Sequence, residues 1–198
     1  AMMRFLKPSY SITFLLLPLL LVGGALLQGK VLYWGLPILQ FIPWRVLAYE
    51  QVFRGELLPL WNPLNGMGAP LLANYQLAWF YPPSWFLGLF YWWGGAPWLA
   101  WGFTLLTILH LAWAGWGMTR LMKRLGCGVL AQVVAGMAFG FSQYFIARIN
   151  FFSMIWTGAW LPWVVSSVDE VLIGASEAKT TRTRVLSLAL VLAMQLLA

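Results

Sequence analysis

Two carboxylates are candidates for acid–base chemistry, because Glu50 and Glu56 are the only acids between residues 30 and 96. Either side chain could act as a general base toward an acceptor hydroxyl, or as a ligand for a divalent metal ion. Each also has a simpler interpretation. Glu50 would belong to a solvated helix face, and Glu56 would be a charge at a helix end.

Arg45 is the candidate for binding a phosphate. A guanidinium group presents its N–H donors in a planar fork that can hold a phosphate through two parallel hydrogen bonds. The alternative is that Arg45 extends to the headgroup level of a bilayer with no partner other than lipid.

Uncharged amide side chains could hydrogen-bond the hydroxyl groups of a sugar. The alternative is local turn chemistry, in which such side chains bond to neighbouring backbone groups. Turn chemistry is favoured for Asn62 and Asn65, which adjoin a proline and a glycine. Asn74 and Gln76 lie outside an obvious turn, so they and Tyr81 are candidates to line a sugar or acceptor site.

Two further ionisable side chains lie among apolar runs. His110 is inside such a run, where an ionisable group is a functional candidate. The alternative is a neutral histidine bonded to a neighbouring helix. Arg148 lies in a short turn, where it could face the first loop and bind substrate or simply anchor the interface. Cys127 is the only cysteine, which excludes an intrachain disulfide and a cysteine-cluster metal site.

The composition is that of an integral membrane protein. The 198 residues are 62% hydrophobic and 9% charged, with a mean hydropathy of +0.78, whereas a soluble domain carries about 25% charged residues. The 14 Trp and 7 Tyr suit the interfacial belts of a bilayer. The net charge of +7 is scattered in short groups between apolar runs, so we expect no nucleic-acid partner.

The apolar runs predict an all-α polytopic transmembrane helix bundle with a single transmembrane domain. Spans are expected at residues 11–29, 97–118, 128–149 and 151–168, with part of a fifth at 185–198. A signal peptide is the alternative for the first run, but the run is long for one and no clear cleavage site follows. Because the chain stops inside the fifth run, we expect it to be the N-terminal part of a longer protein.

Basic residues predict the orientation of these spans, because cytoplasmic loops carry an excess of Lys and Arg. A cytoplasmic N-terminus in a bacterial inner membrane would make residues 30–96 a large outer loop. The cytoplasmic side would then hold Arg4, Lys7, Arg120, Lys123, Arg124, Lys179, Arg182 and Arg184, and the outer side Lys30, Arg45, Arg54 and Arg148.

The outer loop is expected to contain amphipathic and interfacial helices. Residues 43–54 predict an amphipathic helix that begins at a proline and ends before Gly55. Residues 57–83 are uncharged, aromatic and rich in turn formers, which suits irregular backbone at a bilayer surface. Residues 84–93 are apolar but too short to span, so an interfacial or re-entrant helix is expected.

Four segments occur in a recognisable order: LQFIPWR (39–45), GELLPLWNPLNGMGAPLLANYQLAWFYPP (55–83), AGMAFGFSQYFIARI (135–149) and AWLPWV (159–164). Together they resemble the N-terminal third of bacterial YfhO-like multipass membrane proteins, a family similar to the GT-C superfamily of glycosyltransferases. The resemblance implies transfer of a sugar from a polyprenyl-phosphate carrier at the outer membrane face. It also implies a first outer loop with amphipathic helices and a catalytic Asp early in that loop.

The chain departs from this pattern at the acidic position. Gly35, Leu36 and Pro37 stand where the family's acid would precede LQFIPWR, and the outer loop contains no Asp. Glu50 or Glu56 could substitute, the acid could lie beyond this chain, or this branch does not catalyse.

The sequence therefore predicts a membrane glycosyltransferase of the GT-C type that acts on cell-envelope glycans or lipids. Its partners would be membrane lipid and a polyprenyl-phosphate-linked sugar, with Arg45 holding the phosphate and Glu50 or Glu56 acting as base or metal ligand. The alternative is a non-catalytic membrane protein that binds or transports a polyprenyl lipid.

Overall fold

A computed structural model describes residues 23–173 and 178–198 of the chain. The structure is mostly helical, with 73% helix and 2% strand, which confirms the all-α class. Its elements are η1 (Pro37–Phe41), α2 (Ile42–Phe53), β1 (Trp61–Asn62), β2 (Ala69–Pro70), η2 (Tyr75–Leu77), η3 (Pro82–Trp85), α3 (Phe86–Arg124), α4 (Val129–Gly140), α5 (Gln143–Ala147), α6 (Phe152–Ala159), α7 (Leu161–Ile173) and α8 (Ala178–Leu197).

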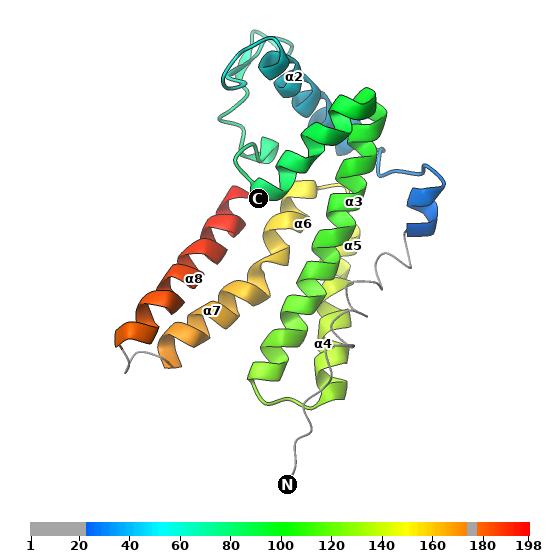
Figure 1. Cartoon of the computed structure of the whole chain (residues 1–198). Helices are drawn as coiled ribbons and strands as arrows, with labels where there is room; N and C mark the ends of the chain where they lie inside the picture. The colour runs from blue at the N-terminus through cyan, green and yellow to red at the C-terminus, as the bar shows by residue number, and fades with distance from the viewer. Residues whose placement is uncertain (1–22, 174–177) are drawn as a thin grey trace.

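The helices from α3 onward run up and down along one long axis (Figure 1). The long helix α3 is central, since it contacts α4, α6 and α7, while α8 packs on α6 and α7. Residues 37–85, which we call the cap, lie at the upper end in Figure 1, above the ends of α6 and α8. The turn that joins α3 to α4 lies at the opposite end, where α7 ends and α8 begins.

The predicted helix at residues 43–54 is confirmed as α2, and its end follows from the sequence. Gly55 adopts a φ of +97°, a conformation that costs a glycine little. The N–H of Gly55 bonds to the Val52 carbonyl, and the N–H of Glu56 bonds to the Gln51 carbonyl. These two bonds are a Schellman motif, which satisfies carbonyl groups that the helix end would otherwise leave free.

A small hairpin follows α2, in which β1 and β2 pair antiparallel with Trp61 opposite Pro70. The Gln51 side chain ties this hairpin to α2, since its Nε2 donates to the Trp61 carbonyl at 2.6 Å. Gly68 has a φ of +100°, and the Trp61 ring occupies the space where a side chain at residue 68 would begin. The turn formers of this stretch therefore place an uncharged hairpin against the cap helix.

The helix α3 consists of two arms, because Gly94 and Gly95 break its backbone. Gly95 has a φ of +68°, and Pro97 then falls in the first turn of the second arm, where its missing N–H costs little. The first arm packs on the second, since Phe90 and Leu87 fill the space beside Gly102. The helix expected at residues 84–93 is thus present as the end of η3 and the first arm of α3, and its interfacial position stays a prediction.

Glycines allow α4 to pack closely on the second arm of α3. A Cβ atom at Gly115 would lie 3.0 Å from the Gly136 carbonyl oxygen. A Cβ atom at Gly140 would lie 3.1 Å from the Leu111 carbonyl oxygen. Close approach of helix backbones through small residues is a common way for membrane helices to associate.

The later helices differ in extent from the expected spans. The run expected at 128–149 is broken after Gly140, and α5 begins at Gln143. The run expected at 151–168 is broken at Trp160, because Pro162 starts the new helix α7 and lacks the N–H that a continuous helix needs. The last helix begins at Ala178 and not at Val185. Apolar composition predicted that helices occur here but not where each one ends.

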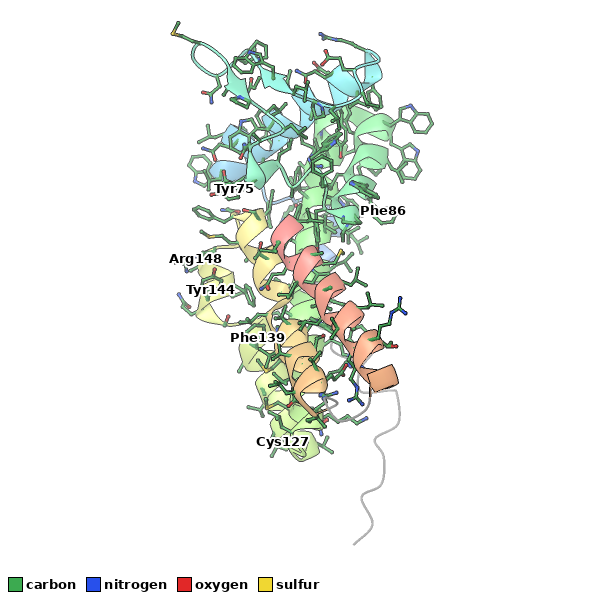
Figure 2. All side chains as sticks on the ribbon, turned by 90° about the vertical axis from the view of Figure 1, so that its left-hand side faces the viewer. Tyr75, Phe86, Cys127, Phe139, Tyr144 and Arg148 are labelled. Atoms are coloured by element: carbon green, nitrogen blue, oxygen red, sulfur yellow. The ribbon has the colours of Figure 1, made fainter. Side chains whose placement is uncertain are left out.

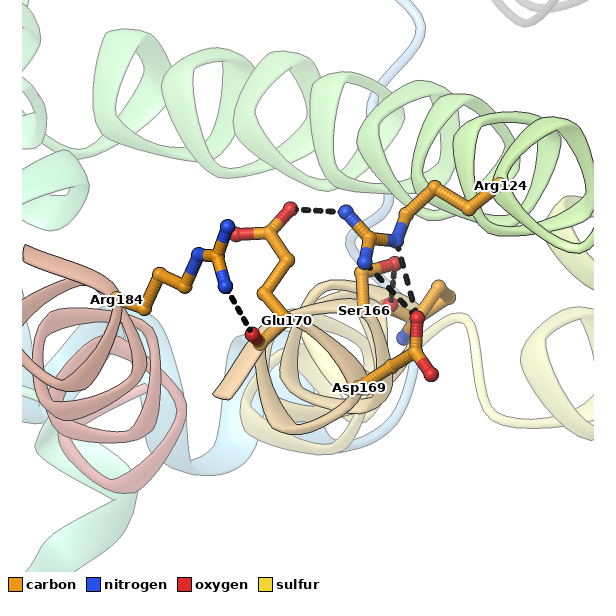
Figure 3. A network of polar contacts seen from close by, with 6 residues as sticks. Arg124, Ser166, Asp169, Glu170 and Arg184 are labelled. Carbon is orange, nitrogen blue, oxygen red and sulfur yellow. Dashed lines mark hydrogen bonds and ion pairs between the residues drawn. The ribbon is translucent and has the colours of Figure 1, made fainter. Parts of the chain in front are cut away.

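Ion pairs and a hydrogen bond join three helices at the end opposite the cap. Arg124 bonds to Asp169 at 2.9 Å and to Glu170 at 2.5 Å, which connects α3 to α7. Arg184 of α8 donates to the Glu170 carbonyl at 3.3 Å. Figure 3 shows the Arg124 guanidinium between the two carboxylates, with Arg184 on the other side of Glu170. Arg124 and Arg184 were both expected on the same side of a membrane, and both lie at this end of the molecule.

Two stretches in the described part of the chain are long and apolar enough to cross a membrane, Pro82–Arg124 and Val129–Ala147. Two such helices alone do not confirm the predicted polytopic bundle, since buried helices of soluble proteins pass the same test. The first expected span, residues 11–29, lies mostly outside the described residues, and residues 23–27 at its end are helical.

Candidate functional site

Arg45 is buried in the cap, with 1% of its surface exposed. It lies on α2 and points toward the segment that joins η2 to η3. Its Nη2 donates to the Leu77 carbonyl, and its Nη1 donates to the Ser84 hydroxyl at 3.3 Å. The guanidinium carbon also lies 5.9 Å from the centre of the Tyr49 ring and 5.7 Å from that of Trp79. Carbonyl, hydroxyl and aromatic groups therefore surround the charge.

No carboxylate neutralises this charge within the part of the chain that the structure describes. The ion pairs there join Arg54 to Glu50 and Arg124 to Asp169 and Glu170, and none includes Arg45. Burial lowers the pKa of the Arg45 guanidinium, and the neighbouring Tyr49 partly opposes this shift. An arginine stays protonated in proteins all the same. A buried charge without a counterion costs several kcal/mol of desolvation free energy, and an anion bound beside Arg45 would offset part of that cost.

A groove of about 500 Å³ opens beside Arg45. Two buried polar atoms in the lining of the groove have no hydrogen-bond partner. They are the Nε of Arg45 and the hydroxyl oxygen of Tyr49, a residue that is 7% exposed. The Nε–H of Arg45 is a donor and the Tyr49 hydroxyl can donate or accept, and buried polar groups are normally paired. The groove is lined by Arg45, Tyr49, Val52, Phe53, Trp79, Trp85, Gly88, Leu89 and Trp92.

Most of these lining residues were not identified from the sequence, although a signal for some of them is present. Trp85, Leu89 and Trp92 follow a helical i, i+4, i+7 spacing, so they form one stripe along the start of α3. Arg45 and Tyr49 are likewise one turn apart on α2. The two stripes face each other because of the turns between residues 54 and 82. Hydrophobic periodicity does not predict the geometry of those turns.

The two candidate carboxylates lie outside the groove lining. Glu50 is on α2 and pairs with Arg54 at 3.6 Å, with 43% of its side chain exposed. This weak pair is the one expected from their spacing. Glu56 follows the helix end and is exposed. The described residues contain no cluster of three His, Cys, Asp or Glu side chains that could hold a metal ion.

The candidate amides make local turn contacts. The Oδ1 of Asn74 accepts a hydrogen bond from the Gln76 N–H at 3.1 Å and so starts the short helix η2. The Oδ1 of Asn62 accepts from the Leu64 N–H at 2.9 Å, as turn chemistry predicts. Asn74 and Gln76 are both partly exposed. Neither is among the residues that line the Arg45 groove.

Tyr81 of the cap and His110 of α3 form a buried network where the cap meets the helix bundle. The Tyr81 hydroxyl lies 2.6 Å from Nε2 of His110 and accepts a hydrogen bond from Nε1 of Trp160 at 2.8 Å. Nδ1 of His110 lies 2.7 Å from the Leu106 carbonyl. Because Nδ1 must donate to that carbonyl, Nε2 is the acceptor and the Tyr81 hydroxyl is its donor. Tyr81 is fully buried, so it contacts neighbouring helices and not the groove.

Arg148 lies away from the groove, at the end of α5. Its guanidinium carbon is 4.5 Å from the centre of the Tyr144 ring, a cation–π contact. Figure 2 shows the two side chains together on the surface of α5, below Tyr75 of the cap. The structure therefore brings Arg45, Tyr49 and the first arm of α3 together, and leaves Arg148, Glu56 and Asn74 outside that group.

Comparisons with protein-family models, with curated proteins and with solved structures found no match to this chain. The resemblance to YfhO-like proteins therefore stays a prediction from the four sequence segments.

Proposed function

We propose that this chain forms the membrane-embedded part of a protein that binds a polyprenyl-phosphate-linked sugar in the groove beside Arg45. The observation that carries the proposal is a fully buried guanidinium that has no carboxylate partner among the described residues and borders an aromatic groove. A phosphate would supply the missing negative charge and accept hydrogen bonds from Arg45 Nε and Tyr49 Oη. Apolar and aromatic walls suit the lipid part of such a ligand.

The exposed surfaces of α4 and α8 support the membrane part of the proposal. Leu130 and Val134 of α4 are 77% and 56% exposed, and Leu186 and Leu190 of α8 are 61% and 65% exposed. Contiguous apolar faces of this kind are rare on soluble monomers. Lipid chains would cover both helices, and the chain would then be polytopic, with the cap outside the cytoplasmic membrane.

The length of α3 would place the groove at headgroup level. A hydrocarbon core about 30 Å thick needs about 20 helical residues. Counted upward from Arg124, that distance ends near Thr104, just below Gly102. The first arm of α3 packs beside Gly102. Trp85 and Trp92, which are 60% and 72% exposed, would therefore lie in the interface that tryptophan prefers.

Single cysteines test this arrangement in the Cys127→Ser background, with an impermeant maleimide applied to intact cells. Leu64→Cys in the hairpin should react, and Leu125→Cys between α3 and α4 should react only after the cells are opened. Val134→Cys should stay unreacted in both cases, because lipid covers it although half its surface is exposed in the protein alone. Reaction of Val134→Cys in opened membranes would contradict the transmembrane placement of α4.

A glycosyltransferase of the GT-C type is the second candidate function. It is favoured by Glu50, which lies on the same helix as Arg45 and about 7.5 Å further along its axis. Glu50 is turned by about 140° around α2 from Arg45 and lies beside Tyr91, which stacks on the groove residue Tyr49. From there it could activate the hydroxyl of an acceptor that binds at the edge of the groove. We expect membranes that contain the full-length protein to transfer label from a radioactive polyprenyl-phosphate sugar, and Glu50→Gln to abolish the transfer. Transfer that survives both Glu50→Gln and Glu56→Gln would remove these residues from catalysis.

The binding site itself is tested with dodecyl phosphate, an amphiphile with one phosphate group and an alkyl chain. Its binding to purified protein should be saturable and should quench the fluorescence of the groove tryptophans. Arg45→Gln should weaken binding by about 30-fold or more, because it removes the charged partner of a buried pair.

Arg54→Gln is the matched control, since it removes the same charge from the same helix at a side chain that is 74% exposed. It should bind dodecyl phosphate almost as well as the wild type. Equal weakening by Arg45→Gln and Arg54→Gln would indicate general attraction to a basic surface. Absence of saturable binding by the wild type would overturn the proposed function.

A further inference from the structure

The Arg45 guanidinium is held by one short segment of the cap, residues 77–84. The Leu77 carbonyl and the Ser84 hydroxyl at the two ends of this segment accept its Nη hydrogen bonds. The Ser84 hydroxyl also contacts the carbonyl oxygens of Ala78 and Tyr81, both at 2.8 Å. The direction in which Arg45 points therefore depends on the conformation of this segment.

The segment contains backbone strain at Ala78. Its φ is +47° and its ψ is +43°, the left-handed conformation, in which an L-residue brings its Cβ too close to the backbone. Among the described residues it is the only non-glycine residue with a positive φ. Strained residues persist where the surrounding structure holds them, and they cluster at binding sites and switch regions. Some other part of the fold must therefore stabilise this conformation.

The Tyr81 network supplies that stabilisation. Tyr81 follows Ala78 by three residues, and its N–H bonds to the Ala78 carbonyl at 3.2 Å. Its hydroxyl is fixed by His110 of α3 and by Trp160, between α6 and α7. Its ring also stacks on Trp156 of α6, with centroids 5.9 Å apart. The two ends of the segment thus orient Arg45, and its interior is attached to the helix bundle.

We propose that Tyr81, His110 and Trp160 form a latch that holds residues 77–84 in the strained conformation that presents Arg45 to the groove. Tyr81 and His110 are then positioning residues for the anion site, although neither lines it. This inference rests on the proposed binding function. When the latch is broken, Ala78 relaxes to a negative φ, the Leu77 carbonyl moves away from Arg45, and the guanidinium loses its fixed direction.

The test measures dodecyl phosphate binding to purified full-length variants. Tyr81→Phe keeps the ring but removes the hydroxyl, and His110→Phe removes its acceptor. Each should weaken binding by roughly 5-fold or more, the usual size of coupling between two sites. Amide hydrogen exchange should become faster at Tyr81 and Ser84 in both variants. Leu121→Ala, a buried change at the far end of α3, should lower thermal stability and leave binding unchanged.

The Ala78→Gly change distinguishes affinity lost through the latch from affinity lost through weaker packing. Glycine holds a positive φ without strain, so the latch is no longer needed to maintain it. Adding Ala78→Gly to Tyr81→Phe should restore most of the lost affinity. A loss of affinity caused by lower thermal stability alone would also appear in Leu121→Ala, which is expected to bind normally.

The outcomes separate the latch from the function on which it depends. Saturable binding by the wild type that is unchanged in Tyr81→Phe and His110→Phe would overturn the latch and leave the binding site in place. A loss in both variants that Ala78→Gly fails to restore would show that strain at Ala78 is not what the network holds, which also overturns the latch. No saturable binding by the wild type would overturn the proposed function and the latch together.

Discussion

The uncompensated charge of Arg45 is the constraint on which this account depends. Its guanidinium is buried under aromatic rings, and its hydrogen bonds go to a carbonyl and a hydroxyl, not to a carboxylate. Neutral acceptors and ring faces offset part of the desolvation cost of a buried cation, but they do not cancel its charge. An anion that enters the groove would supply the remaining stabilisation.

The rest of the fold can be understood as support for that charge. The glycine break at Gly94 and Gly95 folds the first arm of α3 back, so that Trp85 and Trp92 form one wall of the groove. The Schellman motif after α2 ends that helix, and the hairpin packs against it through Gln51. Tight packing of α4 on α3 and the ion pairs of Arg124 hold the bundle on which the cap lies. Local turn chemistry thus determines where distant aromatic residues meet.

Local patterns predicted the helices well and the site only in part. The glycine that ends α2, the Glu50–Arg54 pair and the short helix before residue 94 followed from spacing and turn residues, and the structure confirms them. The predicted start of α2 at Pro43 was wrong, because α2 begins at Ile42 and continues from η1 without a break. Arg45 was identified as a phosphate candidate, but its burial was not, because an arginine beside an apolar stripe usually extends to solvent. The breaks at Gly140 and Trp160 and the meeting of Tyr81 with His110 depend on tertiary contacts. Hydrophobic periodicity carries no information about such contacts.

The central claim is most directly tested by an experimental structure of the protein with 12-bromododecyl phosphate, in which bromine marks the end of the alkyl chain. The account predicts that the phosphate lies within hydrogen-bond distance of Arg45 Nε and Tyr49 Oη. It also predicts that the anomalous signal of bromine appears along the wall formed by Trp85, Leu89 and Trp92. A phosphate found only at exposed basic residues such as Arg54, with the groove free of ligand, would contradict it.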